Sequence, residues 1–152
     1  MKLYLVQHGQ QNPENIDPEK NLSDKGKKDV ANIAAFLRKS NIKLTSIYHS
    51  GKARAQQTAD ILAQSLTPNE VHQREGLNPM DPIDPMMKEL ETNISDIMIV
   101  GHLPYLSNVA TSLLCENSKN ELIQFQQGGV VCLEKAEDTW KLTWMIIPEL
   151  LA

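Results

Sequence analysis

The chain has 152 residues, of which 41% are hydrophobic and 22% charged, a composition typical of a single globular domain over residues 1–152. Its formal net charge of -4 argues against a nucleic-acid partner, because phosphate backbones are bound by basic protein faces. No apolar run approaches the roughly 20 residues of a membrane-spanning helix. Residues 1–6 reach Gln7 and His8 before an export signal could form, so we expect a cytoplasmic protein without membrane contact.

The first half of the chain predicts two repeats of a buried strand followed by a helix. Residues 2–6 are nearly all apolar, which is typical of a strand buried on both faces of a parallel sheet. After a polar loop, Ser23 is placed to cap a helix with the apolar spacing Val30, Ile33, Ala34 and Leu37. A short strand near residues 46–48 leads into segment 50–59, where a second helix begins.

The second half of the chain continues the alternation of strand and helix and then ends in two consecutive strands. Residues 96–100 predict another buried strand, followed by Gly101-His102 and a helix with Pro104 in its first turn. Two strands near residues 129–134 and 139–147 are joined by the polar turn 135–138, which predicts an antiparallel hairpin. We therefore expect an α/β three-layer sandwich, with a mostly parallel central sheet between helices and a C-terminal antiparallel hairpin.

Two further features have ordinary structural interpretations. Cys115 and Cys132 lack disulfide or metal-type spacing and predict two reduced core thiols. Three prolines in segment 78–85 suggest either a polyproline ligand for a partner domain or a stiff loop before a helix at residues 86–90, and the loop is favoured.

Three polar side chains, His8, Arg54 and His102, each come just after a predicted strand. Ligands of open parallel sheets bind beyond the carboxyl ends of the strands, so we expect these three to converge. Two helices are expected to begin at the same edge, and their free N–H groups favour an anion. Phosphoryl transfer needs positive charge and in-line positioning, and histidine is a competent nucleophile near neutral pH. Either histidine could be that nucleophile on this argument.

Other phosphate and metal sites are not supported by the residues. The chain has neither a Gly-x-x-x-x-Gly-Lys-Ser/Thr loop nor a Gly-x-Gly-x-x-Gly turn. His8 and His102 lack nearby histidine partners and a clear carboxylate set, so no metal site is expected. His49 and His72 match no motif and are interpreted as ordinary polar residues.

These motifs resemble the histidine phosphatase superfamily, the phosphoglycerate-mutase-like group, and within it the small phosphohistidine phosphatase SixA branch. The matching segments cover nearly the whole chain: Gln7-His8-Gly9, Leu22-Ser23-x-x-Gly26, Ser50-x-x-x-Arg54-Ala55-x-x-Thr58 and Gly101-His102-x-Pro104. The resemblance implies that His8 becomes phosphorylated on a ring nitrogen. It also implies that Arg54, His102 and the backbone N–H of Leu103 hold the phosphoryl oxygens, without a metal or organic cofactor.

The main departure from the family pattern is Gln7, where the family places a phosphate-binding arginine. Gln7 can still bind the phosphoryl group by donating a hydrogen bond, but losing a charge-assisted donor in such a site typically costs about 3 kcal/mol, or roughly a hundredfold or more in rate. Lys52, two residues before Arg54, is a candidate for partial compensation. Gly51 replaces the proline that is common in this motif and leaves Arg54 in register.

The chain is also too short for the inserted segment that supplies a glutamate general acid in larger relatives. Glu75 and Asp81 are the nearest candidates for that acid, and the alternative is that none is needed, because a phosphoramidate leaves more easily once its nitrogen is protonated. The expected function is a metal-independent phosphatase, of low activity if Gln7 weakens it, acting on protein phosphohistidine or small phosphoesters. The alternatives are a catalytically weak module that binds phosphate or a phosphorylated protein, and a sugar-phosphate mutase, which the missing insert disfavours.

Overall fold

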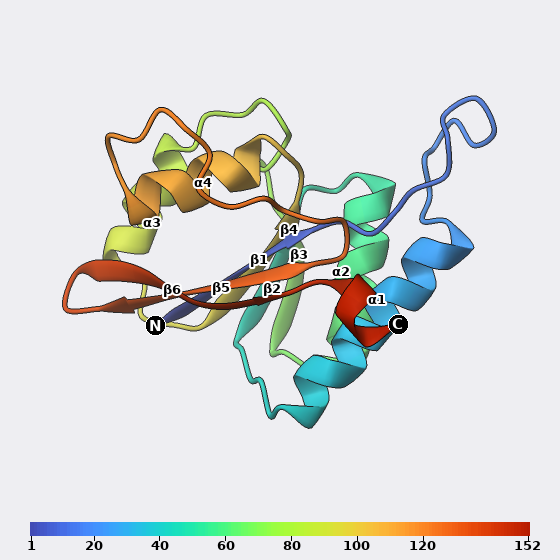
Figure 1. The fold of residues 1–152 in the computed structure, drawn as a ribbon, viewed down its shortest axis with the longest axis horizontal. Helices are drawn as coiled ribbons and strands as arrows, with labels where there is room; N and C mark the ends of the chain where they lie inside the picture. The colour runs from blue at the N-terminus through green and yellow to red at the C-terminus, as the bar shows by residue number, and fades with distance from the viewer.

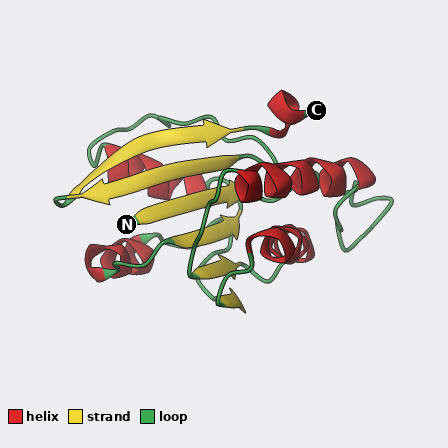
Figure 2. Ribbon diagram, turned by 90° about the horizontal axis from the view of Figure 1, so that it is seen from below, coloured by secondary structure: helices red, strands yellow, loops and turns green.

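The computed structural model describes all residues from Met1 to Ala152. Its centre is one six-stranded sheet with the strand order β3-β2-β4-β1-β5-β6, drawn side by side in Figure 2. The strands are β1 (Lys2–Gln7), β2 (Ser46–His49), β3 (Glu70–Gln73), β4 (Ile97–Gly101), β5 (Val130–Ala136) and β6 (Thr139–Ile146). The helices are α1 (Asp24–Lys39), α2 (Ala53–Leu66), α3 (Asp84–Thr92), α4 (Tyr105–Leu114) and a short 3-10 helix, η1 (Pro148–Leu151).

The sheet is mostly parallel, as the sequence predicts. Strand β4 pairs in parallel with both β1 and β2, and β2 pairs in parallel with β3. Strands β5 and β6 form the expected antiparallel hairpin, and β5 pairs antiparallel with β1. Strand β3 was not predicted, because all four of its residues are exposed and it carries no buried apolar run.

Side chains that alternate along the buried strands build two cores on opposite faces of the sheet. Tyr4 and Val6 of β1 belong to the core under α1 and α2, whereas Leu3 and Leu5 belong to the core under α3 and α4. Figure 1 shows these two helix pairs on either side of the sheet. This arrangement is the expected three-layer α/β sandwich, and it explains why residues 2–6 are apolar without alternation.

The loop after β1 is held against the start of α1 by a cap and by a close approach of backbones. Ser23 Oγ accepts the Gly26 backbone N–H at 3.0 Å, and the Ser23 backbone N–H donates to the Gln10 carbonyl at 2.9 Å. A Cβ atom at Gly26 would overlap the Gln10 carbonyl oxygen, and one at Gly9 would lie 2.8 Å from Val30 Cγ2. Both glycines therefore let the segment that follows His8 lie directly on α1.

Two sequence expectations need local correction. Pro104 lies immediately before α4 rather than in its first turn, because the helix begins at Tyr105. Cys132 is buried in β5, but Cys115 is exposed at the end of α4 and is not a core thiol. Both thiols are free.

The proline-rich segment forms a turn and then starts a helix, as the loop interpretation predicts. The Asn78 backbone N–H donates to Asp81 Oδ2 at 2.8 Å, and Pro85 lies in the first turn of α3. None of the helices has both the length and the apolar character needed to cross a bilayer.

Replacing Gly26 with alanine tests the contact between α1 and the loop after β1. Alanine adds helix propensity, but its Cβ meets a backbone carbonyl that cannot rotate away. We expect Gly26→Ala to lower the free energy of unfolding by about 1–3 kcal/mol in urea denaturation, the usual cost of overpacking. The matched control is Lys28→Ala on the exposed face of α1, which should change it little. An unchanged free energy of unfolding in Gly26→Ala would contradict the close approach.

Candidate active site

Three neighbouring strands end where the candidate residues begin. His8 follows β1, Ser50 follows β2 and His102 follows β4, and β4 lies between β1 and β2 in the sheet. The His8 and His102 ring centroids are 5.0 Å apart. Arg54 lies in the first turn of α2, the helix that follows β2, and its charge acts on both histidines. The structure thus brings together the three residues that the sequence singles out.

His8 is fixed in orientation by its own strand end. The side chain is 6% exposed, and Nδ1 lies 2.8 Å from the Gly9 carbonyl oxygen, while the His8 backbone N–H donates to the Gly101 carbonyl at 3.0 Å. A carbonyl only accepts hydrogen bonds, so Nδ1 carries the proton of the neutral ring. The lone pair is consequently on Nε2, which makes Nε2 the nucleophilic atom.

Burial keeps this ring neutral. It lowers the pKa of His8 to about 4, even though the bond to Gly9 acts in the opposite direction, and the charge of Arg54 lowers the pKa further. At neutral pH the Nε2 lone pair is therefore free to attack an electrophile.

His102 is still more buried, with 2% of its surface exposed. Its Nε2 lies 2.6 Å from Ser50 Oγ, and its Nδ1 is buried with no hydrogen-bond partner in the chain. Burial lowers the pKa of His102 to about 3, with smaller contributions from His8, Arg54 and Lys52. The ring is neutral near pH 7 and has one nitrogen available to a ligand.

Arg54 carries a positive charge that no acidic residue of the chain balances. It forms no ion pair, its Nε is buried without a hydrogen-bond partner, and burial lowers its pKa. A guanidinium remains protonated under these conditions. A buried donor without a partner is costly, so the site is built for an anion that accepts from Arg54.

Thr58 connects the His8 loop to the helix that carries Arg54. Its side chain is fully buried, its Oγ1 accepts the Gly9 N–H at 3.0 Å, and the same hydroxyl donates to the Arg54 carbonyl at 2.8 Å. One hydroxyl thus fixes the distance between the two functional segments.

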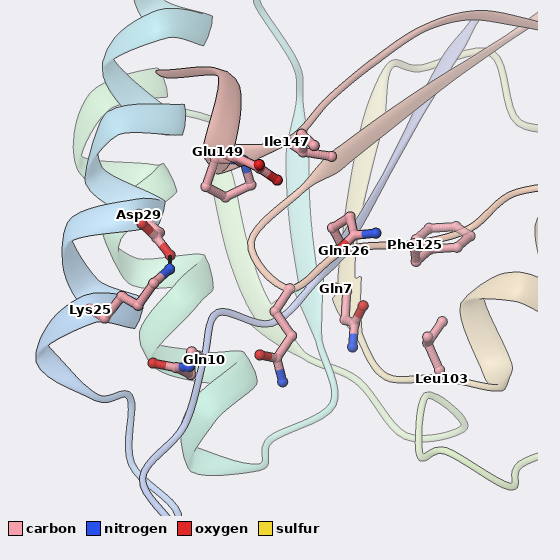
Figure 3. Close-up of a pocket in the computed structure, with 11 residues that line it drawn as sticks. Gln7, Gln10, Lys25, Asp29, Leu103, Phe125, Gln126, Ile147 and Glu149 are labelled. Atoms are coloured by element: carbon pink, nitrogen blue, oxygen red, sulfur yellow. Dashed lines mark hydrogen bonds and ion pairs between the residues drawn. The ribbon is translucent and has the colours of Figure 1, made fainter. Parts of the chain in front are cut away.

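Gln7 ends β1 and lines a cavity of about 430 Å³, whose lining includes neither histidine nor Arg54. Its Oε1 is buried without a hydrogen-bond partner. Figure 3 shows Gln7 beside Leu103, whose backbone N–H donates no hydrogen bond within the chain. The rest of the cavity lining is largely polar: Gln10, Lys25, Asp29, Phe125, Gln126, Gln127, Ile147, Pro148 and Glu149. The cavity reaches the site through Gln7 and Leu103, which directly precede His8 and follow His102 in the sequence.

Lys52 lies at the rim of the site. It immediately precedes α2, its side chain is exposed and makes no hydrogen bond, and its charge contributes to the low pKa of His102. The two candidates for the general acid, Glu75 and Asp81, are less well placed to act on a ligand. The Glu75 side chain is exposed and forms no hydrogen bond or ion pair within the chain, and Asp81 accepts the Asn78 N–H of a surface turn.

Ser50 and Thr58 were not singled out individually by the sequence reasoning. Thr58 occupies the buried face of α2 four residues after Arg54, a signal visible in the helical spacing. Ser50 directly follows a buried strand, as the two histidines do. His49 has a structural contact instead, because its Nδ1 accepts the Gly51 N–H at 3.2 Å, and His72 is exposed beside Glu70.

Comparison with known proteins places this arrangement in a family. A sequence profile described as histidine phosphatase superfamily (branch 1) matches residues 3–85, which include Gln7, His8 and Arg54. The chain belongs to the histidine phosphatase superfamily. No curated protein sequence matches it closely enough to add a more specific assignment.

Solved structures show the same fold in several known phosphatases. The protein histidine phosphatase SixA complexed with tungstate superposes with a TM-score of 0.87 at 16% identity, over 100% of both chains. The protein assigned as SixA in Agrobacterium tumefaciens gives 0.79 at 18% identity, over 97% of both chains. Phosphoserine phosphatase of Entamoeba histolytica, solved with phosphoserine, gives 0.75 at 18% identity, over 99% of both chains. At these identities the likeness establishes the histidine phosphatase fold.

Removing the Thr58 hydroxyl tests how the site is held together. Thr58→Val keeps the shape of the side chain but leaves the buried Gly9 N–H without an acceptor, so we expect a loss of about 1–3 kcal/mol in the free energy of unfolding. Inorganic phosphate, titrated by calorimetry, should bind more weakly because the His8 loop is no longer fixed to α2. Thr111→Val on α4, whose Oγ1 has no partner, is the control and should leave both quantities near native. Native stability and phosphate affinity in Thr58→Val would refute this role.

The buried histidines also make stability depend on pH. His8 and His102 have folded-state pKa values of about 4 and about 3, below the ordinary value of 6.5, so below pH 6.5 the unfolded chain binds protons that the folded chain does not. The free energy of unfolding should therefore fall as the pH is lowered from 7 to 5, measured in urea at each pH. His8→Asn and His102→Asn should each flatten this dependence, and the exposed control His72→Asn should not. Equal slopes in all four proteins would contradict the burial argument.

Proposed function

We propose that this chain is a phosphatase that transfers a phosphoryl group first to Nε2 of His8 and then to water. The observation that carries the proposal is a neutral histidine with its lone pair on Nε2, next to a half-buried arginine whose Nε is buried and which has no anionic partner. The superfamily membership and the likeness to phosphatases of the same fold support the same activity.

In the first step, the Nε2 lone pair forms a bond to phosphorus while the bond from phosphorus to the leaving oxygen or nitrogen breaks. The electron pair of that bond departs with the leaving atom, which receives or already carries a proton. Arg54, His102 and the Leu103 N–H hold the phosphoryl oxygens and stabilise charge in the transition state. In the second step, water attacks phosphorus, the N–P bond breaks, its electron pair returns to Nε2 and the water proton is released.

The substrate class we propose is a phosphohistidine on a protein or a small phosphoester. Phosphohistidine fits a site without a well-placed acid, since its leaving nitrogen accepts a proton before the bond breaks. Glu75 is exposed and Asp81 is engaged in a turn, which supports a substrate that needs little help from an acid. The residues that bind and react are sufficient without a metal, because Arg54 supplies the positive charge.

A second function is favoured by one residue. Gln7 presents an uncharged amide where the family has an arginine, and a site with one arginine fewer binds phosphate without stabilising the transition state as strongly. The alternative is thus a catalytically weak module that holds phosphate or a phosphorylated protein in the same pocket.

Phosphate release from a phosphohistidine-bearing protein and from p-nitrophenyl phosphate separates these functions. We expect His8→Ala to lose at least about a thousandfold in turnover, because the nucleophile is absent. Gln7→Arg should raise turnover by about a hundredfold, through one more charged donor. The control His72→Ala removes an exposed histidine on the edge strand β3 and should keep the native rate. Release that persists in His8→Ala would refute the phosphatase, and release seen only in Gln7→Arg would favour the binding module.

Lys52 is proposed to compensate partly for the charge missing at Gln7. Because its side chain is exposed at the rim, Lys52→Ala should weaken phosphate binding only about two- to fivefold, and less at high salt. Calorimetric titration with phosphate at two ionic strengths measures this effect. Lys28→Ala, an exposed lysine on α1, is the matched control. Unchanged phosphate affinity and turnover in Lys52→Ala would show that Lys52 does not contribute to the site.

A further inference from the structure

The shortest side-chain contact of the site joins Ser50 to His102. Ser50 Oγ and His102 Nε2 lie 2.6 Å apart, at the ends of the adjacent strands β2 and β4, whose last paired residues are His49 and Val100. The pairing of the two strands thus sets the distance between the hydroxyl and the ring. This contact uses the ring nitrogen that faces away from the unpartnered Nδ1.

The hydrogen bond between Ser50 and His102 can run in either direction, and each direction requires a different tautomer of the His102 ring. If Nε2 carries the proton, it donates to Ser50 Oγ and Nδ1 is left with a lone pair. If Ser50 donates to Nε2, the neutral ring must carry its proton on Nδ1. Only the second tautomer presents an N–H to a phosphoryl oxygen, whereas a lone pair on Nδ1 would repel it.

Neighbouring groups favour the second direction. Ser50 Oγ also lies 3.4 Å from the Lys52 backbone N–H, which can only donate, so an acceptor lone pair of the hydroxyl is already directed toward that N–H. No acceptor of the chain other than Nε2 lies within hydrogen-bond distance of the hydroxyl, so its hydrogen is free for Nε2.

We propose that Ser50 is a positioning residue that donates its hydroxyl hydrogen to Nε2 of His102 and thereby holds His102 as the tautomer protonated on Nδ1. The buried Nδ1–H beside His8 is then a neutral hydrogen-bond donor to the phosphoryl group. This inference deepens the proposed function and rests on it for the role of the bound phosphoryl group.

The proposed role of Ser50 matters more because Gln7 replaces the arginine of the family. With the Gln7 amide in place of the family's arginine, the proposed donors to the phosphoryl group are two charged side chains, Arg54 and the rim residue Lys52, and three neutral groups, the Gln7 amide, the Leu103 N–H and His102. A wrong tautomer at His102 would replace one of these donors with an acceptor. Partners that orient a metal-ligating histidine typically contribute 10- to 100-fold to the affinity or activity of its site, and we expect an effect of the same order from Ser50.

The test compares native protein with Ser50→Ala, Ser50→Thr and Ser46→Ala. Ser46 is a buried serine at the opposite end of β2, so Ser46→Ala controls for the loss of a hydroxyl from the same strand. Nitrogen-15 spectra of the histidine rings report directly which nitrogen of His102 is protonated. We expect the Nδ1-protonated form in the native protein, in Ser50→Thr and in Ser46→Ala, and a mixture of tautomers in Ser50→Ala.

The second readout is function, with inorganic phosphate as the probe for affinity and phosphohistidine as the substrate. Ser50→Ala should bind phosphate about tenfold more weakly and lose roughly 10- to 100-fold in kcat with a smaller change in KM, while Ser50→Thr should retain most of both. A native His102 protonated on Nε2 would overturn the inference. So would a Ser50→Ala protein with native phosphate affinity, or a stably folded Ser50→Thr that is as impaired as Ser50→Ala. If the native protein forms no phosphoenzyme, the proposed function fails, but the tautomer and phosphate affinity still decide the inference about Ser50.

Discussion

Burial of two imidazole rings beside an unbalanced guanidinium is the constraint on which the site depends. Because His8 and His102 are removed from water and lie near Arg54, protonation of either ring is disfavoured, and the positive charge of the pocket is confined to the arginine. The remaining ring nitrogens are then free for chemistry: Nε2 of His8 as a nucleophile and Nδ1 of His102 toward a ligand. The ligand that can interact with all three groups at once is an anion with several acceptor oxygens, such as a phosphoryl group.

The scaffold maintains this arrangement with a small number of backbone contacts. The strand order places the ends of β1, β4 and β2 side by side, and the Gly9 N–H bonds to Thr58 across the gap to α2. The close packing of Gly9 and Gly26 holds the His8 loop on α1. Gly9, Gly26 and Thr58, which make these contacts, belong to the superfamily motifs. The motifs therefore contain residues that hold the site together as well as residues that react.

Much of the fold was predictable because it follows from local patterns. Continuous apolar runs at residues 2–6 and 96–100 indicated strands covered on both faces, and Ser23 with the spacing of Val30 and Leu37 indicated a capped, half-buried helix. Strand β3 escaped prediction because its residues are exposed, so only pairing with β2 defines it. Pro104 was placed one residue too far into α4, because sequence alone does not fix where a helix begins.

The candidate site, like the fold, was only partly predictable from the sequence. Residue types at strand ends pointed to His8, Arg54 and His102, but they left open which histidine is the nucleophile, and only the family resemblance singled out His8, without specifying which ring nitrogen reacts. That distinction comes from the Gly9 carbonyl on Nδ1 of His8 and from Ser50 on Nε2 of His102, which are contacts made only in the folded chain. Gln7 was visible as a departure from the family, but the burial of its amide oxygen beside the histidines was not.

The central claim, that His8 accepts the phosphoryl group on Nε2, is tested most directly by trapping the phosphoenzyme. The protein would be mixed with a phosphoramidate donor and quenched in alkali, which preserves phosphohistidine. The modified residue would then be located by mass spectrometry and its isomer assigned by phosphorus NMR. The account predicts one phosphate on His8, attached to Nε2, that disappears as water discharges it. Phosphate on Nδ1 of His8, on His102, or on neither histidine would contradict it.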